Sequence, residues 1–377
     1  MIIDEIIDII ISEQGIDSVS DSELANIWNW EVKEGMNGNF FLGNGQFEMR
    51  EMRFDEPKDN QVLIRNMAAG ICGTDVHIMH GEKGSADVTP PVVLGHEYAG
   101  EVIAVGKNVT TCRVGDHVTV DPNIYCGKCG YCRIGKKQLC EHLVAIGVNY
   151  NGGFAQYSMV PDSQVFRLSD DLPWEVGAMT EPLACCLRGI RRARITPGDL
   201  AVIVGGGTIG LMMMQLALLS GASRVIVSEP SETRRKLAMQ LGAFAALNPA
   251  DGQLDGQIAG ITNRRGADVV IECAGNVRAT QSAFEAADHG ANIVLFSVPQ
   301  TDAVYPLKLF DVYSKEWNIS GSFINPDTHL EAADLLSAGR IQILPLITHR
   351  YPLAQLRDAI EKQTMPDSVK VMVLPQE

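Results

Sequence analysis

Apolar residues in the middle of the chain form short unbroken runs, and a glycine-marked turn and a longer mixed segment separate one run from the next. Such runs fall within residues 201–204, 224–228, 266–275 and 291–299. Their length and spacing predict buried parallel strands that alternate with helices. Before residue 186 the pattern changes to V-x-V alternation with frequent glycine turns, which is typical of a β-rich fold. The patterning therefore predicts an α/β protein that joins a β-rich part to a doubly wound parallel sheet.

A third pattern occupies the N-terminal segment. Apolar residues there fall on one face of a predicted helix that ends at Gly15, and acidic residues fall on the other: Ile2, Ile3, Ile6, Ile7 and Ile10 against Asp4, Glu5 and Asp8. A capping box from Ser20 to Glu23 predicts a second short helix. Residues 1–35 contain nine acidic residues and one lysine. This composition lacks the basic residues of a transit or signal peptide.

Three interpretations of this extension stay open. The helix that ends at Gly15 packs on its own or a neighbouring subunit, or residues 1–20 are a docking peptide like those that target enzymes to bacterial microcompartment shells. Alternatively, translation starts at Met36, because the chain reads as a complete enzyme from there.

Length and charge narrow the class of protein. A chain of 377 residues is long for a single core and natural for two domains. A formal net charge of −15 without a basic patch argues against nucleic acid as a partner. The longest apolar stretch, residues 201–219, is interrupted by glycines and by Thr208 and Gln215, so it predicts a strand, a turn and a helix. We therefore expect a cytoplasmic protein that neither crosses a membrane nor binds nucleic acid.

Four cysteines have the spacing of a closed metal site. Cys126, Cys129, Cys132 and Cys140 follow a C-x2-C-x2-C-x7-C pattern. Four thiolates complete the tetrahedral shell of one Zn²⁺ and leave no position for a substrate, so this zinc would be structural. Two disulfides are the weaker interpretation, since the chain has nine cysteines and no apparent secretory signal.

The run at 201–204 leads into a dinucleotide-binding motif. Gly205, Gly207 and Gly210 form G-x-G-x-x-G between a predicted strand and a predicted helix, and Thr208 and Ile209 complete the turn. The first glycine permits the tight turn, the second lets the backbone approach a pyrophosphate, and the third lets the helix pack on the strand. The phosphates would lie at the N-terminus of the helix.

The acid that follows the next strand favours NAD over NADP. Glu229 comes 24 residues after Gly205 and is placed to accept the adenosine ribose hydroxyls, where it repels a 2′-phosphate. Arg234 and Arg235 follow in the next predicted helix. Arg234 is included among the candidate cofactor residues, with exposure of both arginines to solvent as the alternative.

Dispersed residues suggest a second metal site. Cys72, His96, Glu97 and Glu181 provide the thiolate, imidazole and carboxylate groups that Zn²⁺ accepts. Three of them and an exchangeable water would make an open zinc that polarises an alcohol or carbonyl oxygen. Taken singly, each could be an ordinary packing or hydrogen-bonded core residue.

The order of these motifs is similar to that of a known family. The runs GICGTDVH, GHEYAGEVIAVGKNV and TEPLACC, together with the four-cysteine segment and the glycine motif, resemble zinc-dependent medium-chain alcohol and polyol dehydrogenases. The resemblance covers roughly residues 36–374 and is nearest to the sorbitol dehydrogenase branch.

The resemblance implies an architecture and a set of roles. It implies a GroES-like β-rich catalytic domain at 36–186, a Rossmann domain at 187–323 and a C-terminal return to the catalytic domain at 324–377, after the extension at 1–35. It makes Cys72 and His96 ligands of a catalytic zinc.

The remaining zinc position is shared by Glu97, Glu181 and water, and which glutamate binds directly stays open. The resemblance also places Thr74 and His77 in a relay that carries the alcohol proton to water.

These implications predict an oxidoreductase with two Zn²⁺ per subunit and NAD. We expect hydride transfer from a polyol or secondary alcohol, because polyol-type members of the family carry a glutamate at the position of Glu181. The alternatives are a dehydrogenase of a sugar phosphate, of a threonine-like amino alcohol or of a short primary alcohol, and a non-catalytic NAD-sensing or scaffold protein. The resemblance also implies a homodimer or homotetramer. Tyr98, Asn123 and Phe154 are separate candidates for lining the substrate pocket.

Overall fold

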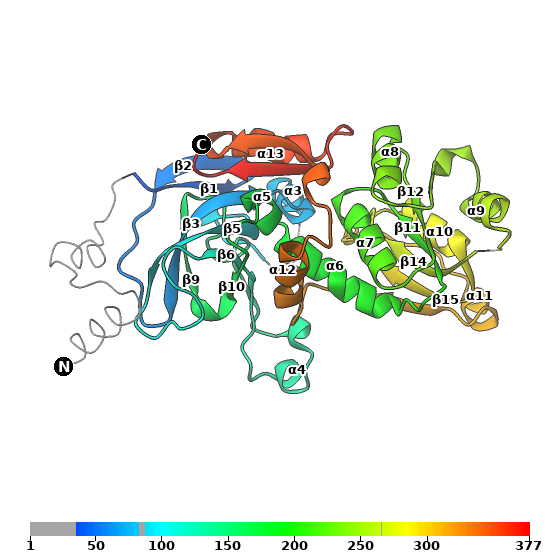
Figure 1. Cartoon of the computed structure of the whole chain (residues 1–377), viewed down its shortest axis with the longest axis horizontal. Coiled ribbons are helices and arrows are strands. Elements are labelled where there is room, and N and C mark those ends of the chain that lie inside the picture. The colour runs from blue at the N-terminus through cyan, green and yellow to red at the C-terminus, as the bar shows by residue number, and fades with distance from the viewer. Residues whose placement is uncertain (1–34, 83–86, 265) are drawn as a thin grey trace.

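The computed structural model describes residues 35–82, 87–264 and 266–377, and it divides into two halves joined by helix α6 (Figure 1). The helices predicted in the N-terminal extension, and the docking role of residues 1–20, lie outside the described residues. One half is built around a parallel sheet and the other around antiparallel sheets. The predicted fold class is confirmed.

The parallel sheet has six strands in the order β13-β12-β11-β14-β15-β16. This is the 3-2-1-4-5-6 order of a Rossmann fold, whose ligand crevice lies at the carboxyl ends of the strands, beside the first strand and the fourth. Here those two strands are β11 and β14. The strands are β11 (Leu200–Val204), β12 (Arg224–Ser228), β13 (Ala245–Leu247), β14 (Ala267–Glu272), β15 (Ala287–Leu295) and β16 (Asn318–Gly321).

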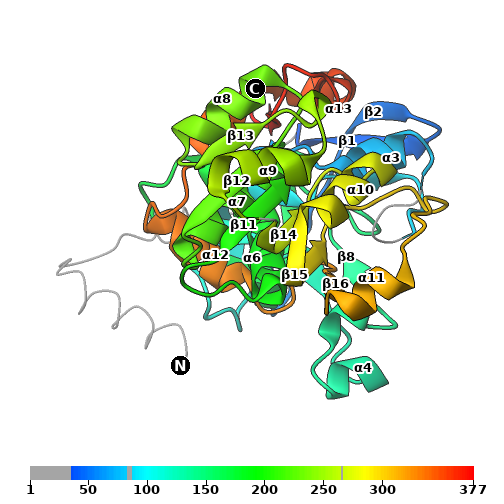
Figure 2. The same cartoon turned by 90° about the vertical axis from the view of Figure 1, so that its right-hand side faces the viewer.

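Helices connect these strands and cover both faces of the sheet (Figure 2). Every residue of β11 is buried, which explains why its sequence is an unbroken apolar run and not an alternating one. The helices are α7 (Thr208–Leu219), α8 (Glu232–Gln240), α9 (Leu254–Thr262), α10 (Val277–Ala286) and α11 (Leu309–Ser314).

The β-rich half contains a seven-stranded sheet and two smaller ones. The large sheet follows the order β10-β6-β5-β3-β18-β17, with β9 also paired to β3. Its strands are β3 (Gln61–Gly70), β5 (Glu97–Val105), β6 (His117–Val120), β9 (Tyr157–Pro161), β10 (Val165–Arg167), β17 (Ile347–Pro352) and β18 (Lys370–Leu374). The smaller sheets pair β1 (Asn37–Gly43) with β2 (Gln46–Glu51) and β4 (Val92–Val93), and β7 (Asn123–Ile124) with β8 (Val144–Ala145).

The C-terminal segment returns to the β-rich half. Strand β18 pairs antiparallel with β3, and β17 pairs parallel with β18. The remaining helices are α3 (Gly73–Met79), α4 (Gly130–Arg133), α5 (Trp174–Gly177), α6 (Thr180–Ala193), α12 (His329–Ser337) and α13 (Leu356–Gln363).

One hydrophobic cluster extends through both halves. It includes Ala99 of β5, Leu183 of α6 and Met213 of α7, so α6 is packed on each side. Within the described residues, no helix combines the length and the apolar character needed to span a membrane.

Candidate active site and metal centres

The antiparallel pairing of β3 with β5 brings the dispersed metal-ligand candidates together. In this register Gly70, the last residue of β3, lies opposite Glu97, the first residue of β5. Cys72 follows β3 by two residues, and His96 immediately precedes β5. The three ligand atoms of Cys72, His96 and Glu97 lie within 4.8 Å of one another. The structure therefore gathers three of the four residues predicted for the open zinc.

Asp75 supports this group from the first turn of α3. Its Oδ2 accepts a hydrogen bond from the Cys72 N–H at 2.8 Å, which fixes the start of the helix. Its Oδ1 faces His96 Nδ1 at 3.8 Å, too far for a hydrogen bond. Both atoms are buried and lack a hydrogen-bond partner in the described part of the chain. A small movement of the imidazole would let Asp75 accept from Nδ1 and leave Nε2 for a metal.

The electrostatics of the group suit a cation. Burial, assisted by the Glu97 carboxylate, raises the pKa of the Cys72 thiol. Burial also raises the pKa of Asp75 to about 6, although His96 opposes this effect. Burial alone would lower the pKa of His96, but the neighbouring Cys72, Asp75 and Glu181 raise it well above its ordinary value. Because several acidic groups share one buried site, a divalent cation fits the residues present.

Glu97 has a second partner that the sequence did not suggest. Its Oε2 forms a buried ion pair with Lys370 Nζ, which also donates to the Ile71 carbonyl oxygen at 2.8 Å. Both side chains are almost completely buried. Gly70 makes room for the pair, because a Cβ atom there would lie 2.4 Å from Glu97 Oε2 and 2.7 Å from Lys370 Cε. Lys370 therefore compensates one carboxylate of the site.

Glu181 approaches the group from the first turn of α6. Burial is the main reason that the pKa of Glu181 rises to about 7, with Glu97 adding to the rise and His96 opposing it. The Cys185 thiol donates to Glu181 Oε1 at 3.3 Å from one turn further along the helix. Glu181 lies close enough to interact with His96 and Glu97 but is outside the tight group of three.

The two candidate relay residues lie on α3. Thr74 and His77 are both half-buried, and their spacing of three residues places them on one face of the helix. His77 Nδ1 contacts the carboxylate of Glu82, whose N–H in turn donates to the His77 carbonyl oxygen at 2.9 Å. The imidazole is therefore held between the helix and an acidic side chain near solvent.

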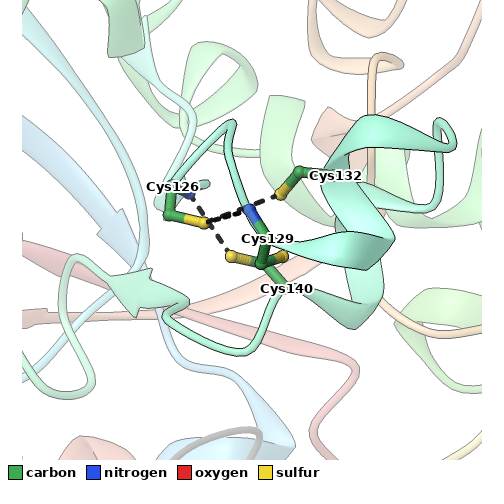
Figure 3. A group of neighbouring side chains, drawn as sticks. All are labelled: Cys126, Cys129, Cys132 and Cys140. Carbon is green, nitrogen blue, oxygen red and sulfur yellow. Dashed lines mark hydrogen bonds between the residues drawn. The ribbon is translucent and has the colours of Figure 1, made fainter.

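The four-cysteine segment folds around a single point (Figure 3). The sulfur atoms of Cys126, Cys129, Cys132 and Cys140 lie within 4.8 Å of one another. All nine cysteines are in the described residues and none forms a disulfide. Four sulfurs at about 2.3 Å from one ion would be about 3.8 Å apart, and Cys126 Sγ and Cys132 Sγ are 4.0 Å apart. The geometry suits a shared ion.

Backbone amides support the thiolate form of Cys126 and Cys129, whereas burial raises the pKa of Cys132. The Cys126 N–H donates to Cys140 Sγ at 3.3 Å, and the Cys129 N–H donates to Cys126 Sγ at 3.3 Å. Backbone N–H groups of Cys132 and Glu141 lower the pKa of Cys129 to about 6. Such amide contacts are typical of the surroundings of a bound metal, so the residues present fit a closed zinc site.

The glycine motif adopts the geometry that dinucleotide binding requires. Gly205 has a φ of +104°, a conformation that favours glycine. A Cβ atom on Gly210 would lie 1.8 Å from the Gly205 carbonyl oxygen, so this glycine allows α7 to pack on the strand end. A Cβ atom on Gly207 would meet no protein atom within 4 Å. Gly207 thus leaves open space at the N-terminus of α7.

Glu229 lies beside this turn, at the end of β12. Its Oε2 accepts from the Gly206 N–H at 2.7 Å and its Oε1 accepts from the Ser231 N–H at 2.8 Å. Arg235 Nη1 donates to the carbonyl oxygens of Glu229 and Pro230. The carboxylate is therefore buried and fixed at the edge of the crevice.

Two other cofactor candidates use their side chains elsewhere. The Thr208 hydroxyl donates to the Val369 carbonyl oxygen at 2.6 Å, and Arg234 Nη2 donates to the Ser368 carbonyl oxygen. Only the backbone of Thr208 is left to contribute to the turn. Ile209 accepts a weak bond from the Cys186 thiol through its carbonyl oxygen at 3.9 Å.

Glu272 was missed by sequence reasoning. It ends β14, opposite Val204 of β11, at the point where the crevice opens. Its Oε1 accepts from the N–H groups of Ala274 and Gly275 at 2.7 and 2.8 Å, and its Oε2 contacts the Ser297 hydroxyl. Glu272 therefore ties the ends of β14 and β15 together. The signal that could have found Glu272 is an acid at the end of an apolar strand; for Lys370 it is a lysine at the start of one.

Two of the pocket candidates belong to the core. Tyr98 and Phe154 are both fully buried in the β-rich half, whereas Asn123 is buried in a polar network with Asp121 and Asn325.

Comparisons with known proteins agree with this geometry. Residues 58–170 match the model of the alcohol dehydrogenase GroES-like domain, and residues 208–338 match that of the zinc-binding dehydrogenases. Sorbitol dehydrogenase of Bacillus subtilis is 32% identical over 348 residues, which cover 91% of this chain and 98% of the relative. L-Threonine 3-dehydrogenase of Symbiobacterium thermophilum is 36% identical over 326 residues, covering 85% and 91%. A crystal structure of a zinc-binding dehydrogenase from Sinorhizobium meliloti, bound to NADP, superimposes with a TM-score of 0.87 at 39% identity and covers 91% of this chain and all of that one.

Alanine substitutions should separate the two roles of the glycine motif. Gly207→Ala should leave thermal stability unchanged, because its Cβ meets no protein atom, but should weaken NADH binding by at least about tenfold through contact with the pyrophosphate. Gly210→Ala should lower the free energy of unfolding by about 1–3 kcal/mol, because its Cβ meets the Gly205 carbonyl. NADH fluorescence titration and thermal unfolding measure the two effects.

Gly256→Ala is the matched control, since that helical glycine is exposed and has no atom near the added Cβ. It should keep full NADH affinity. Unchanged NADH affinity in Gly207→Ala would rule out this turn as the pyrophosphate site.

The four-cysteine cluster should hold one zinc that stabilises the fold. Cys129→Ser should reduce the zinc content from two ions per chain to one and lower the thermal midpoint, because the closed shell loses a ligand. Elemental analysis and calorimetry give the two readouts. Cys112→Ser, which changes a buried cysteine outside the cluster, should keep both ions. Equal zinc content in the two variants would contradict the assignment.

Proposed function

Since the chain belongs to the zinc-dependent medium-chain alcohol and polyol dehydrogenases, we propose that it transfers a hydride from a polyol or secondary alcohol to NAD, giving a ketose or ketone. The observation that carries the proposal is the buried group of Cys72, His96 and Glu97, with Glu181 beside it. A carboxylate at position 181, where alcohol dehydrogenases of the family use a second cysteine, favours a polyol over a short primary alcohol.

Cys72 and His96 are the proposed ligands of the catalytic zinc, and Glu97 or Glu181 completes the set. A zinc ion bound there supplies a Lewis acid that lowers the pKa of the substrate hydroxyl. Lys370 holds Glu97 in place and balances its charge. Glu181 lies beside this group on α6, so the two carboxylates approach it from different elements.

Thr74 and His77 carry the proton away in this proposal. The Thr74 hydroxyl lies on the first turn of α3 and takes the alcohol proton, and the imidazole of His77 passes it to solvent. Glu82 fixes the orientation of His77 through its contact with Nδ1. The half-exposed position of His77 gives the proton a route out of the site.

NAD is the proposed cofactor, and it accepts the hydride at the nicotinamide ring. Glu229 is placed for the adenosine ribose hydroxyls, where its buried carboxylate disfavours a 2′-phosphate. The two arginines nearby support this preference, because Arg234 and Arg235 already donate to backbone carbonyl oxygens. The zinc-binding dehydrogenase from Sinorhizobium meliloti was solved bound to NADP, so the preference for NAD proposed here rests on Glu229 and its surroundings in the present chain alone.

An exposed apolar surface supports a homodimer. The β16 face, which we define as Leu309, Phe310, Tyr313 and Ile319, lies at the open edge of the parallel sheet, where β16 pairs only with β15 among the described strands (Figure 2). Leu309 and Tyr313 are each 79% exposed. An open strand edge beside apolar side chains is suited to pairing with a second copy of the chain.

Removing the metal ligands tests the proposed chemistry. Cys72→Ala and His96→Ala should each abolish NAD reduction, measured by absorbance with polyols, secondary alcohols, threonine and ethanol as substrates, because the catalytic zinc loses a ligand. NADH binding should remain measurable in both variants, since the glycine motif is in the other half. Full activity in either variant would disprove the ligand assignment.

A charge on the β16 face should separate the subunits. Phe310→Glu should shift the molar mass measured by light scattering from that of the oligomer toward that of one chain, because a buried carboxylate opposes association. Val114→Glu is the control: it changes an exposed apolar residue of the β-rich half, 61% exposed and outside the β16 face, and should leave the mass unchanged. A wild-type protein that is monomeric would disprove the interface.

A further inference from the structure

One face of α6 leads from the candidate metal site to an arginine. Glu181, Cys185 and Arg188 are spaced by four and three residues, so they lie on the same face of the helix. The thiol of Cys185 contacts Glu181. Seven residues of helix separate Glu181 from Arg188 by about 10 Å along the axis. Helix α6 itself runs between the two halves of the molecule (Figure 1).

The guanidinium of Arg188 lacks a counter-charge. The side chain is half-buried, and its Nε is a buried atom without a hydrogen-bond partner in the described part of the chain. Arg188 also forms no ion pair with any described carboxylate. Burial, and after it the charge of Arg192, lowers the pKa of Arg188.

The charged groups near Arg188 do not neutralise it. Arg191 on the next turn is paired with Glu331. Asp327 is near, but its carboxylate forms an ion pair with Lys137 at 2.6 Å. A half-buried cation next to a second cation is unfavourable unless an anion binds there.

A second unpartnered polar group lies beside the same face. The hydroxyl of Tyr125 is buried and has no hydrogen-bond partner among the described residues. It lies near Cys185 and Glu181, and near enough to Arg188 for the two side chains to interact electrostatically. The phenol and the guanidinium therefore border the same stretch of α6.

The chain just before Tyr125 is linked to α6 by two side-chain hydrogen bonds. Two residues before it, Asn123 Nδ2 donates to Asn325 Oδ1 at 2.5 Å. From the segment of Asn325, the Thr328 hydroxyl donates to the Ala184 carbonyl oxygen of α6 at 2.8 Å. The loop of Tyr125 is thus linked, through Asn325 and Thr328, to the part of α6 that lies between Glu181 and Arg188.

We propose that Arg188 and Tyr125 bind an anionic group, a phosphate or a carboxylate, at the end of the substrate distant from the reacting alcohol. The inference rests on the proposed function and narrows its substrate class to polyol phosphates and sugar acids. The guanidinium donates two hydrogen bonds to such an anion, and the phenol donates a third. About 10 Å of helix separates Glu181 from Arg188, so a substrate with several carbons between its alcohol and its anion fits the site. A short alcohol would leave Arg188 without a partner.

Paired substrates with the same carbon skeleton test the proposal. Sorbitol, sorbitol 6-phosphate and gluconate compare a neutral polyol with the two kinds of anion. The wild-type holoenzyme should have a kcat/KM at least about tenfold higher for one anionic substrate than for sorbitol. Arg188→Gln should remove this advantage, mainly by raising KM, while sorbitol turnover changes less than about threefold. Tyr125→Phe should give a smaller loss with the same selectivity.

Arg192→Gln is the matched control, because it removes an exposed arginine from the same helix. It should leave the selectivity unchanged, and none of the three variants should alter NADH affinity. Calorimetric titration of the anionic substrate into the complex with NADH gives a readout that does not depend on turnover, and Arg188→Gln should weaken this binding about 10- to 100-fold.

The outcomes distinguish this inference from the proposed function. A wild-type enzyme that oxidises sorbitol as well as either anion, or an Arg188→Gln variant that loses the neutral and anionic substrates equally, overturns the anion site and leaves the proposed function standing. An enzyme that oxidises no alcohol but binds the anion through Arg188 overturns the proposed function and leaves the anion site standing. Preference for the phosphate or for the carboxylate identifies the anion.

Discussion

The candidate chemistry depends on the register between β3 and β5. Because Gly70 pairs with Glu97, the residue that begins α3 lies against the residue that precedes β5, and a thiol, an imidazole and a carboxylate meet at one buried point. A slip of one residue would reverse the faces of β5 and separate these groups. The same strand end receives β18, whose first residue, Lys370, reaches Glu97. Strand pairing therefore sets both the donor set and its charge compensation.

Features that depend on neighbours in sequence could be predicted from the sequence. The fold class followed from apolar runs and glycine turns, and it is confirmed. Cys126 to Cys140 lie within one short segment, so their spacing already restricts how they can meet. The glycine turn is equally local, because three residues of one strand-helix connection form it. The family resemblance contributed the dispersed set, which no spacing rule relates. The domain boundaries at 186 and 323 and the roles of the site residues stay predictions.

The rest could not be predicted, because it depends on contacts between distant segments. Lys370 is 273 residues from Glu97 in the sequence. Glu272 can bond to Ser297 only because β14 and β15 end side by side in the sheet. Thr208 and Arg234 were candidate cofactor residues, but a loop at 368–369, far along the chain, provides carbonyl acceptors for the side chains of both. Sequence patterns can identify a polar residue beside a motif, but they do not reveal which distant backbone satisfies it.

That loop has a mechanical consequence. Three consecutive residues bind three different elements: Ser368 accepts from Arg234 of α8, Val369 accepts from Thr208 of α7, and Lys370 pairs with Glu97. Helices α7 and α8 and the carboxylate of Glu97 are thus all bonded to three consecutive residues at the start of β18. A rigid-body shift of α7 or α8 would therefore displace residues 368–370, which also hold Lys370 beside Glu97. If binding at one site shifts these contacts, the resulting free-energy coupling between the two sites must act equally in both directions.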